Sequence, residues 1–304
     1  MKISVIQQSL GMGYNHRSAI MPDLDSLRAK AEARLAECFS LIEEAALSGA
    51  ELAVTIETVN AYTVLGDTRY DYTELYDGVE GETVRRFSAL AKRLGIFIVA
   101  GLLLTLEGEA YNCAVLFDRQ GEVVGIHKKV HLPAGEELHV RAGDSFDVFK
   151  TELGNIGMLV CWDMQYPEAA RELALGGADL ICCPTLGWEN IYGLSRAYEN
   201  SVTIAAAMCA FSSDGPTRVS PSCIVDNMGN IVASAEMGRV CQVTAEVDIL
   251  KEPVPQYGST DFYPSHSMRK TRFSQRRPDT YRRQSLPNSE LELYERYFGK
   301  DNEK

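Results

Sequence analysis

Cys161 is the residue of this chain best placed for nucleophilic chemistry. It follows an apolar run, Ile156 to Val160, that predicts a buried strand, and a helix is expected from Glu168 to Leu175 with Pro167 in its first turn. Such a turn lifts a side chain out of the sheet, as in a nucleophile elbow, and nearby backbone N–H groups favour the thiolate. A cysteine alone is more often a small buried hydrophobe, so the assignment depends on its companions.

Two further reactive residues stand at the ends of predicted strands. Glu57 follows the strand 51–56, and Lys129 ends the strand 123–129. Taken alone, each would be interpreted as an ordinary charged side chain on the surface. With Cys161 they fit acyl transfer, in which Glu57 takes the thiol proton and later gives it to the leaving nitrogen. Lys129 and the backbone N–H after the cysteine would stabilise the oxyanion, and the ammonium is expected to favour both anions.

These residues and their neighbours resemble the nitrilase superfamily of carbon–nitrogen hydrolases, in its amidase- or carbamoylase-like branch. Lys129-Val-His-Leu-Pro133 resembles the lysine motif, Cys161-Trp-Asp with Tyr166-Pro-Glu168 resembles the cysteine motif, and Arg196-Ala-Tyr-Glu-Asn200 resembles a later helix. The glutamate motif departs from the usual Phe-Pro-Glu, because Thr55-Ile-Glu57 stands there. The resemblance covers roughly residues 1 to 250 and implies Glu57, Lys129 and Cys161 as the catalytic set.

The resemblance also implies a second glutamate soon after the lysine, which orients that lysine and helps to position substrate. Glu136 is preferred for this role from its spacing to Gly143, and Glu137 is the reserve and a candidate substrate-binding residue. Trp162 and Tyr166 are the other substrate-binding candidates. The histidines that flank the lysine, His127 and His131, are interpreted as packing residues.

The order of the elements predicts an α/β fold. A long amphipathic helix, 24–48, with Asp23 as its cap, precedes the strand that leads to Glu57. The stretch 49–55 and the stretch 177–183 repeat the same step from helix to strand, and a hairpin follows each. Two such halves predict a four-layer α-β-β-α sandwich of two stacked mixed sheets. The loop 58–81 carries four tyrosines that either line a pocket or anchor the loop.

The last part of the chain differs in composition. Residues 1–250 are expected to form the hydrolase domain, and 251–304, rich in Arg, Pro, Ser and Tyr, a C-terminal extension. The resemblance implies a homodimer or higher homo-oligomer, for which this extension is a candidate arm.

Composition excludes several classes of partner. The net charge of −12 argues against nucleic acid and against an anionic membrane surface. The first residues lack the apolar core of a signal peptide, and no apolar run approaches a membrane span. The eight cysteines show no CxxC spacing, so no metal, cofactor or redox pair is indicated, and reduced thiols in a cytoplasm are expected.

The predicted function is cysteine-dependent hydrolysis of a non-peptide C–N bond in a small amide, through a thioester, with release of ammonia or an amine. The alternatives are a nitrilase, an N-carbamoyl hydrolase, and an inactive binding protein of the same fold. Arginine is missing from the four positions after Trp162, Arg171 lies too far into the next helix, and Asp163 would repel an anion if it faced inward. A neutral or cationic amide is therefore preferred to an anionic carbamoyl amino acid, unless a loop arginine such as Arg69 or Arg218 reaches the pocket.

Overall fold

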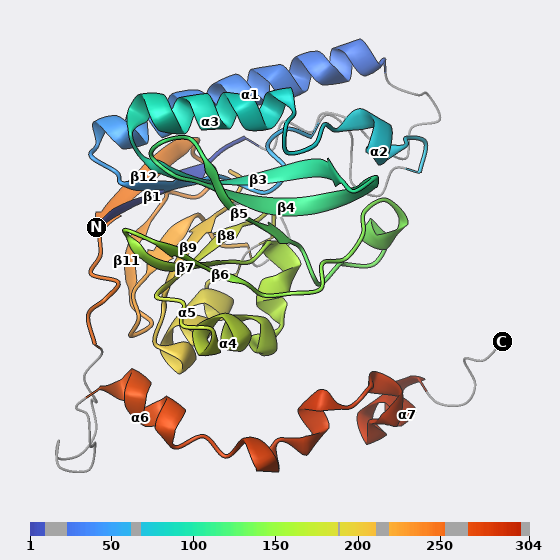
Figure 1. Cartoon of the computed structure of the whole chain (residues 1–304), viewed down its shortest axis with the longest axis vertical. Helices are drawn as coiled ribbons and strands as arrows, with labels where there is room; N and C mark the ends of the chain where they lie inside the picture. The colour runs from blue at the N-terminus through green and yellow to red at the C-terminus, as the bar shows by residue number, and fades with distance from the viewer. Residues whose placement is uncertain (10–22, 62–67, 188, 211–218, 253–266, 299–304) are drawn as a thin grey trace. The chain divides into compact units, whose positions relative to one another are not determined.

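Two six-stranded mixed sheets make up the larger part of the computed structural model (Figure 1). The structure describes all residues except 10–22, 62–67, 188, 211–218, 253–266 and 299–304. The chain divides into two compact units, Met1–Lys251 and Glu252–Lys304, which are described separately.

The first sheet has the order β12-β1-β2-β3-β4-β5. Its strands are β1 (Lys2–Gln7), β2 (Leu52–Val54), β3 (Phe97–Leu106), β4 (Glu109–Phe117), β5 (Val123–Lys128) and β12 (Cys241–Glu246). β1, β2 and β3 are parallel, whereas β4, β5 and β12 run antiparallel to their neighbours. The expected hairpin turn is present, because the Gly121 N–H donates to the Asp118 carbonyl over 3.0 Å.

The second sheet has the order β11-β10-β9-β8-β7-β6 and repeats this arrangement. Its strands are β6 (Val148–Thr151), β7 (Gly154–Met158), β8 (Leu180–Pro184), β9 (Thr203–Ala207), β10 (Cys223–Val225) and β11 (Ile231–Ser234). β7, β8 and β9 are parallel and the other pairs are antiparallel. β6 was not predicted, and β7 lies two residues before the expected strand, because its ladder with β6 begins at Gly154.

Alternate side chains of both sheets form one shared core. Ile3, Val5 and Val54 from the first sheet pack in the same cluster as Ile156 and Met158 from the second. This alternation is what stacked sheets require, because successive side chains of a strand point to opposite faces. The four-layer α-β-β-α sandwich is thereby confirmed.

Helices cover the outer faces (Figure 1). α1 (Leu24–Leu47) and α3 (Glu82–Leu94) lie on the first sheet, where Phe87 stacks on Phe117 with ring centroids 5.8 Å apart. α4 (Pro167–Leu175) and α5 (Asn190–Asn200) cover the second sheet. Asp23 caps α1 as expected, because its side chain accepts the Asp25 N–H. α2 is a single turn at Tyr72–Leu75.

The second unit contains only short helices in its described part. α6 (Met268–Ser274) is capped by the side chain of Ser267, and α7 spans Glu292–Phe298. Three 3-10 turns lie between them, at Pro278–Thr280, Arg282–Ser285 and Asn288–Glu290.

Candidate active site

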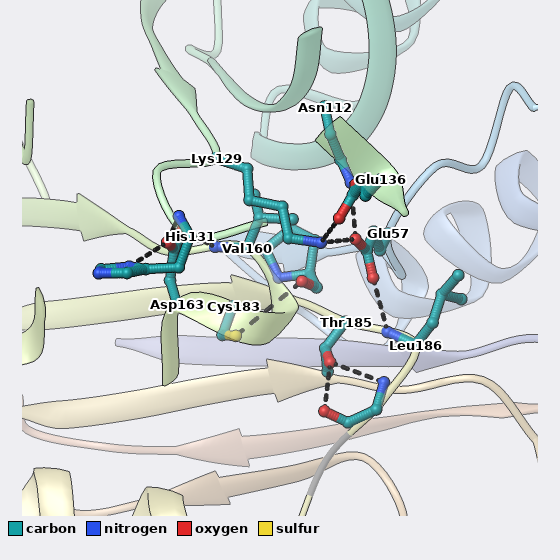
Figure 2. Close-up of polar contacts among 12 residues, drawn as sticks. Glu57, Asn112, Lys129, His131, Glu136, Val160, Asp163, Cys183, Thr185 and Leu186 are labelled. Carbon is teal, nitrogen blue, oxygen red and sulfur yellow. Dashed lines mark hydrogen bonds and ion pairs between the residues drawn. The ribbon is translucent and has the colours of Figure 1, made fainter. Parts of the chain in front are cut away.

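A buried ammonium between two carboxylates is the centre of the candidate site (Figure 2). Lys129 Nζ donates to Glu57 Oε1 over 2.9 Å and to Glu136 Oε2 over 2.8 Å. The three side chains are 1%, 2% and 5% exposed, respectively. Glu57 follows β2, Lys129 follows β5, and Glu136 begins a 3-10 turn, Glu136–Leu138. The structure thus brings together Glu57, Lys129 and Glu136.

Asn112 joins the two carboxylates and was missed by the sequence analysis. Its amide Nδ2 donates to Glu57 Oε1 over 2.7 Å and to Glu136 Oε1 over 2.8 Å. The backbone N–H of Leu186 donates to the other oxygen of Glu57 over 3.0 Å. The available signal was an asparagine within the mostly apolar strand β4, since a buried amide needs polar partners.

The charges of this cluster determine which groups stay ionised. Burial alone would lower the pKa of Lys129, but the carboxylate of Glu57, with Cys161 and Glu136, outweighs burial and raises that pKa. Burial raises the pKa of Glu136 against the opposing effect of the Lys129 ammonium. Lys129 is therefore a fixed positive charge between the two carboxylates.

Cys161 stands at a sharp turn after β7. Its φ of +46° lies in the left-handed region, which is uncommon for a residue with a side chain. A 3-10 turn, Cys161–Gln165, begins at this residue and leads into α4, whose first residue is Pro167. The first N–H groups of such a turn have no partner within it, so they are available to a ligand oxygen. The predicted elbow is therefore present at Cys161.

Burial and a neighbouring carboxylate favour the protonated form of the Cys161 thiol. Burial and the charge of Glu57 raise the pKa of Cys161 to about 12, although Lys129, the Thr185 hydroxyl and the Leu186 N–H act in the opposite direction. The ammonium and a backbone N–H favour the thiolate as expected, but burial and the carboxylate of Glu57 outweigh them. A base is therefore required, and the charge of Glu57 acts directly on this thiol.

The three candidate substrate-binding residues lie in different places. Trp162 and Tyr166 are 38% and 39% exposed on the turn that follows Cys161. The Tyr166 ring stacks on His131 with centroids 3.8 Å apart. Glu137 does not join the cluster: it is exposed, and its carboxylate accepts the Gly135 N–H over 2.7 Å.

Two of the charged residues considered for substrate selection, Asp163 and Arg171, are engaged elsewhere. Asp163 is fully buried, and its carboxylate is directed at His127 and His131. Arg171 donates to the Glu199 carbonyl on α5 over 3.2 Å. Arg69 is half-buried after the loop segment 62–67, and Arg218 lies outside the described residues.

The tyrosines of the loop 58–81 are anchors where the structure describes them. Tyr72 and Tyr76 are 2% and 5% exposed in a small core with Leu103 and Val140. Tyr70 packs against the same core, and Tyr62 lies outside the described residues.

Metal and membrane features were searched in the described part of the chain. There, no group of three His, Cys, Asp or Glu side chains is arranged to hold a metal ion. No helix in the same residues is long and apolar enough to cross a membrane. All eight cysteines are free.

Comparison with known proteins agrees with this geometry. The family model for carbon-nitrogen hydrolase matches residues 18–249. A probable nitrilase of Schizosaccharomyces pombe is 29% identical over 218 residues, which cover 68% of this chain and 76% of the yeast protein. An N-carbamoylputrescine amidase of Arabidopsis thaliana is 32% identical over 151 residues, 48% of this chain and 50% of the plant protein.

The fold is also similar to solved structures. An amidase from Nesterenkonia sp. AN1, whose active-site cysteine carries the acetamide moiety of fluoroacetamide, superposes with a TM-score of 0.71. It is 21% identical, and the match covers 94% of this chain and 97% of that one. The resemblance to the nitrilase superfamily inferred from the motifs is confirmed.

Proposed function

Because the chain belongs to the carbon–nitrogen hydrolase family and is a hydrolase of C–N bonds other than peptide bonds, we propose that Cys161 attacks the carbonyl carbon of a small amide. The observation that carries this proposal is the buried Lys129 ammonium, held between Glu57 and Glu136 and acting electrostatically on the Cys161 thiol. A protonated thiol, a carboxylate base and a fixed cation are the groups that acyl transfer needs.

The first half of the reaction forms a thioester. Cys161 Sγ bonds to the amide carbon while its proton passes to Glu57. The negative charge on the oxygen is stabilised by Lys129 Nζ and the backbone N–H of Trp162. The C–N bond then breaks, and Glu57 gives its proton to the leaving ammonia or amine.

The second half releases the acid. Water attacks the thioester carbon while Glu57 takes one of its protons, the C–S bond breaks, and Glu57 returns that proton to the sulfur, which restores the thiol and the carboxylate. Glu136 takes no proton in this scheme. It holds Lys129 Nζ in place through the hydrogen bond of 2.8 Å.

We infer a neutral or cationic small substrate. The carboxylate of Asp163 is turned to two histidines and Arg171 is held by α5, so these charges leave the selection of substrate to Trp162, Tyr166 and the loops. An N-carbamoyl amine is the second candidate, supported by the likeness to N-carbamoylputrescine amidase. A self-associating enzyme, with the extension 251–304 as an arm, remains part of the proposal.

The test is ammonia release from matched compounds. Acetamide, propionamide and butyramide are compared with a carbamoyl amine, a carbamoyl amino acid and a nitrile of similar length. Cys161→Ala should fold and lose turnover, and limiting iodoacetamide should label Cys161 before the other seven cysteines. A preference of kcat/KM for the carbamoyl acid of roughly tenfold, about 1.4 kcal/mol, would contradict the substrate class. Near-normal hydrolysis by Cys161→Ala would contradict the mechanism.

A further inference from the structure

Asp163 is a fully buried carboxylate that the proposed chemistry does not use (Figure 2). Its Oδ1 accepts from His131 Nδ1 over 2.9 Å and from the backbone N–H groups of His131 and Val130 over 2.8 and 3.2 Å. Its Oδ2 bonds with His127 Nε2 over 2.9 Å and accepts the Val160 N–H over 3.1 Å. Both oxygens are therefore satisfied by several donors.

These bonds keep the carboxylate ionised. Burial alone would raise the pKa of Asp163, but the hydrogen bonds from His127 and His131 outweigh it and hold that pKa well below its usual range. An ionised carboxylate with this many donors gives strong and directional contacts. The arrangement is thus a rigid junction and not a solvated surface charge.

The junction connects the two segments that carry the proposed chemistry. Lys129 follows β5, an edge strand of the first sheet. It lies between His127 on one side and Val130 and His131 on the other. Val160 and Asp163 bracket Cys161, which follows β7 of the second sheet. One carboxylate therefore binds residues on both sides of Lys129 and the residue before Cys161.

We propose that Asp163 is a positioning residue that sets the geometry between Lys129 Nζ and Cys161 Sγ, with His127 and His131 as its hydrogen-bonding partners. The inference rests on the proposed function, because it assumes that these two atoms act on one carbonyl group. The thiol must reach the carbon while the ammonium reaches the oxygen, and a misplacement of about 1 Å can reduce a rate by about 100-fold. Because Lys129 and Cys161 follow strands of different sheets, a fixed connection between these two segments is needed to keep the distance between Nζ and Sγ within about 1 Å.

The decisive variants change hydrogen bonding without removing bulk. Asp163→Asn replaces one acceptor oxygen with an NH₂ group. Each oxygen accepts from at least one backbone N–H, and the NH₂ group cannot accept that hydrogen bond. His127→Gln keeps an amide nitrogen where Nε2 stands, whereas His127→Leu keeps similar volume and loses the donor. Asp147→Asn, on an exposed carboxylate outside the site, is the matched control.

Positioning predicts a specific pattern with butyramide as substrate. At 25 °C, with folding verified by circular dichroism, kcat should fall at least about tenfold in Asp163→Asn and in His127→Leu. KM should change by less than about threefold, since the loss concerns the transition state. His127→Gln should recover kcat to within about threefold, and Asp147→Asn should match the wild type. The rate at which iodoacetamide alkylates Cys161 should fall in Asp163→Asn.

Other outcomes would overturn the proposal. Wild-type kcat per folded molecule in Asp163→Asn and His127→Leu, with only a lower melting temperature, would reduce Asp163 to a structural residue. His127→Gln as inactive as His127→Leu would point to proton transfer by the histidine in place of positioning. Failure of the proposed function is separate: Cys161→Ala would then hydrolyse normally, while the alkylation rate would still report whether Asp163 shapes the surroundings of Cys161.

Discussion

Replacing Lys129 with methionine should destabilise the protein in a way that depends on pH. The change keeps the length of the side chain and removes the ammonium from between Glu57 and Glu136, which it contacts at 2.9 and 2.8 Å. Removing one partner of a buried ion pair costs roughly 3–5 kcal/mol of unfolding free energy. Because Asn112 and Leu186 still donate to the carboxylates, we expect about 3 kcal/mol at pH 7.

The loss should shrink as the pH falls. Burial already raises the pKa of Glu136 in the intact cluster, and without the ammonium the carboxylate pair takes up a proton more readily. A folded-state pKa above the unfolded value of about 4.3 means that the folded protein binds more protons, so its stability rises as pH drops through that pKa. At about 1.4 kcal/mol per pH unit, lowering the pH from 7 to 5 should recover about 1–3 kcal/mol relative to the wild type.

Equilibrium urea unfolding at the two pH values measures this. Lys128→Met is the control. Lys128 is the neighbouring residue, it is half-buried, and its ammonium lies 4.4 Å from the centre of the Tyr111 ring. A cation–π contact of that kind is worth roughly 0.5–1 kcal/mol and has no carboxylate pair to protonate. An equal loss in both variants, or a loss in Lys129→Met that is the same at pH 7 and pH 5, would refute the reasoning.

Four further outcomes are expected. Glu57→Gln should fold and lose at least about 100-fold in kcat, the scale of a missing general base, and wild-type turnover would remove Glu57 from the chemistry. Asn112→Leu should lower the unfolding free energy by roughly 2 kcal/mol, because two buried carboxylates lose a donor, and urea unfolding checks this. The kcat/KM profile should be flat between pH 7 and about 9, because the pKa of Cys161 is raised to about 12 and that of Lys129 is raised as well, so a fall in this window would contradict both. Truncation after Leu250 should lower the number of subunits per particle obtained from light scattering, and an unchanged number of subunits would remove the extension from the interface.

Most of the elements, and three candidate site residues, could be predicted because strand ends are visible in a sequence. Glu57, Lys129 and Cys161 stand at the ends of predicted strands, and the resemblance to the nitrilase superfamily, through the spacing to Gly143, favoured Glu136 over Glu137. Tertiary contacts were less accessible. Asn112 lies in the middle of a strand, where the alternation of side chains does not reveal which buried amide meets which carboxylate.

The direction in which a side chain points, and the charges around it, were also beyond prediction from the sequence. Asp163 was considered as a charge that would repel an anion if it faced inward, but it lies on a 3-10 turn and is bound by His127 on β5 and by His131 after that strand. The pKa of Cys161 depends on how burial, Glu57 and Lys129 balance in space, which no local pattern reports. β6 is four residues long and pairs only with β7, so its period was too short to recognise.

The order of strands in the first sheet has a consequence for folding during synthesis. β1, near the beginning of the chain, has β2 on one side and pairs on the other with β12, its partners running from Lys2 with Glu246 to Gln7 with Cys241. Until the ribosome has released β12, one side of β1 is an open strand edge, which is a template for pairing with other chains. Contacts of such long sequence separation also slow folding. The domain should therefore complete its fold only after residue 246 has emerged, and nascent chains that end earlier should be the ones that aggregate.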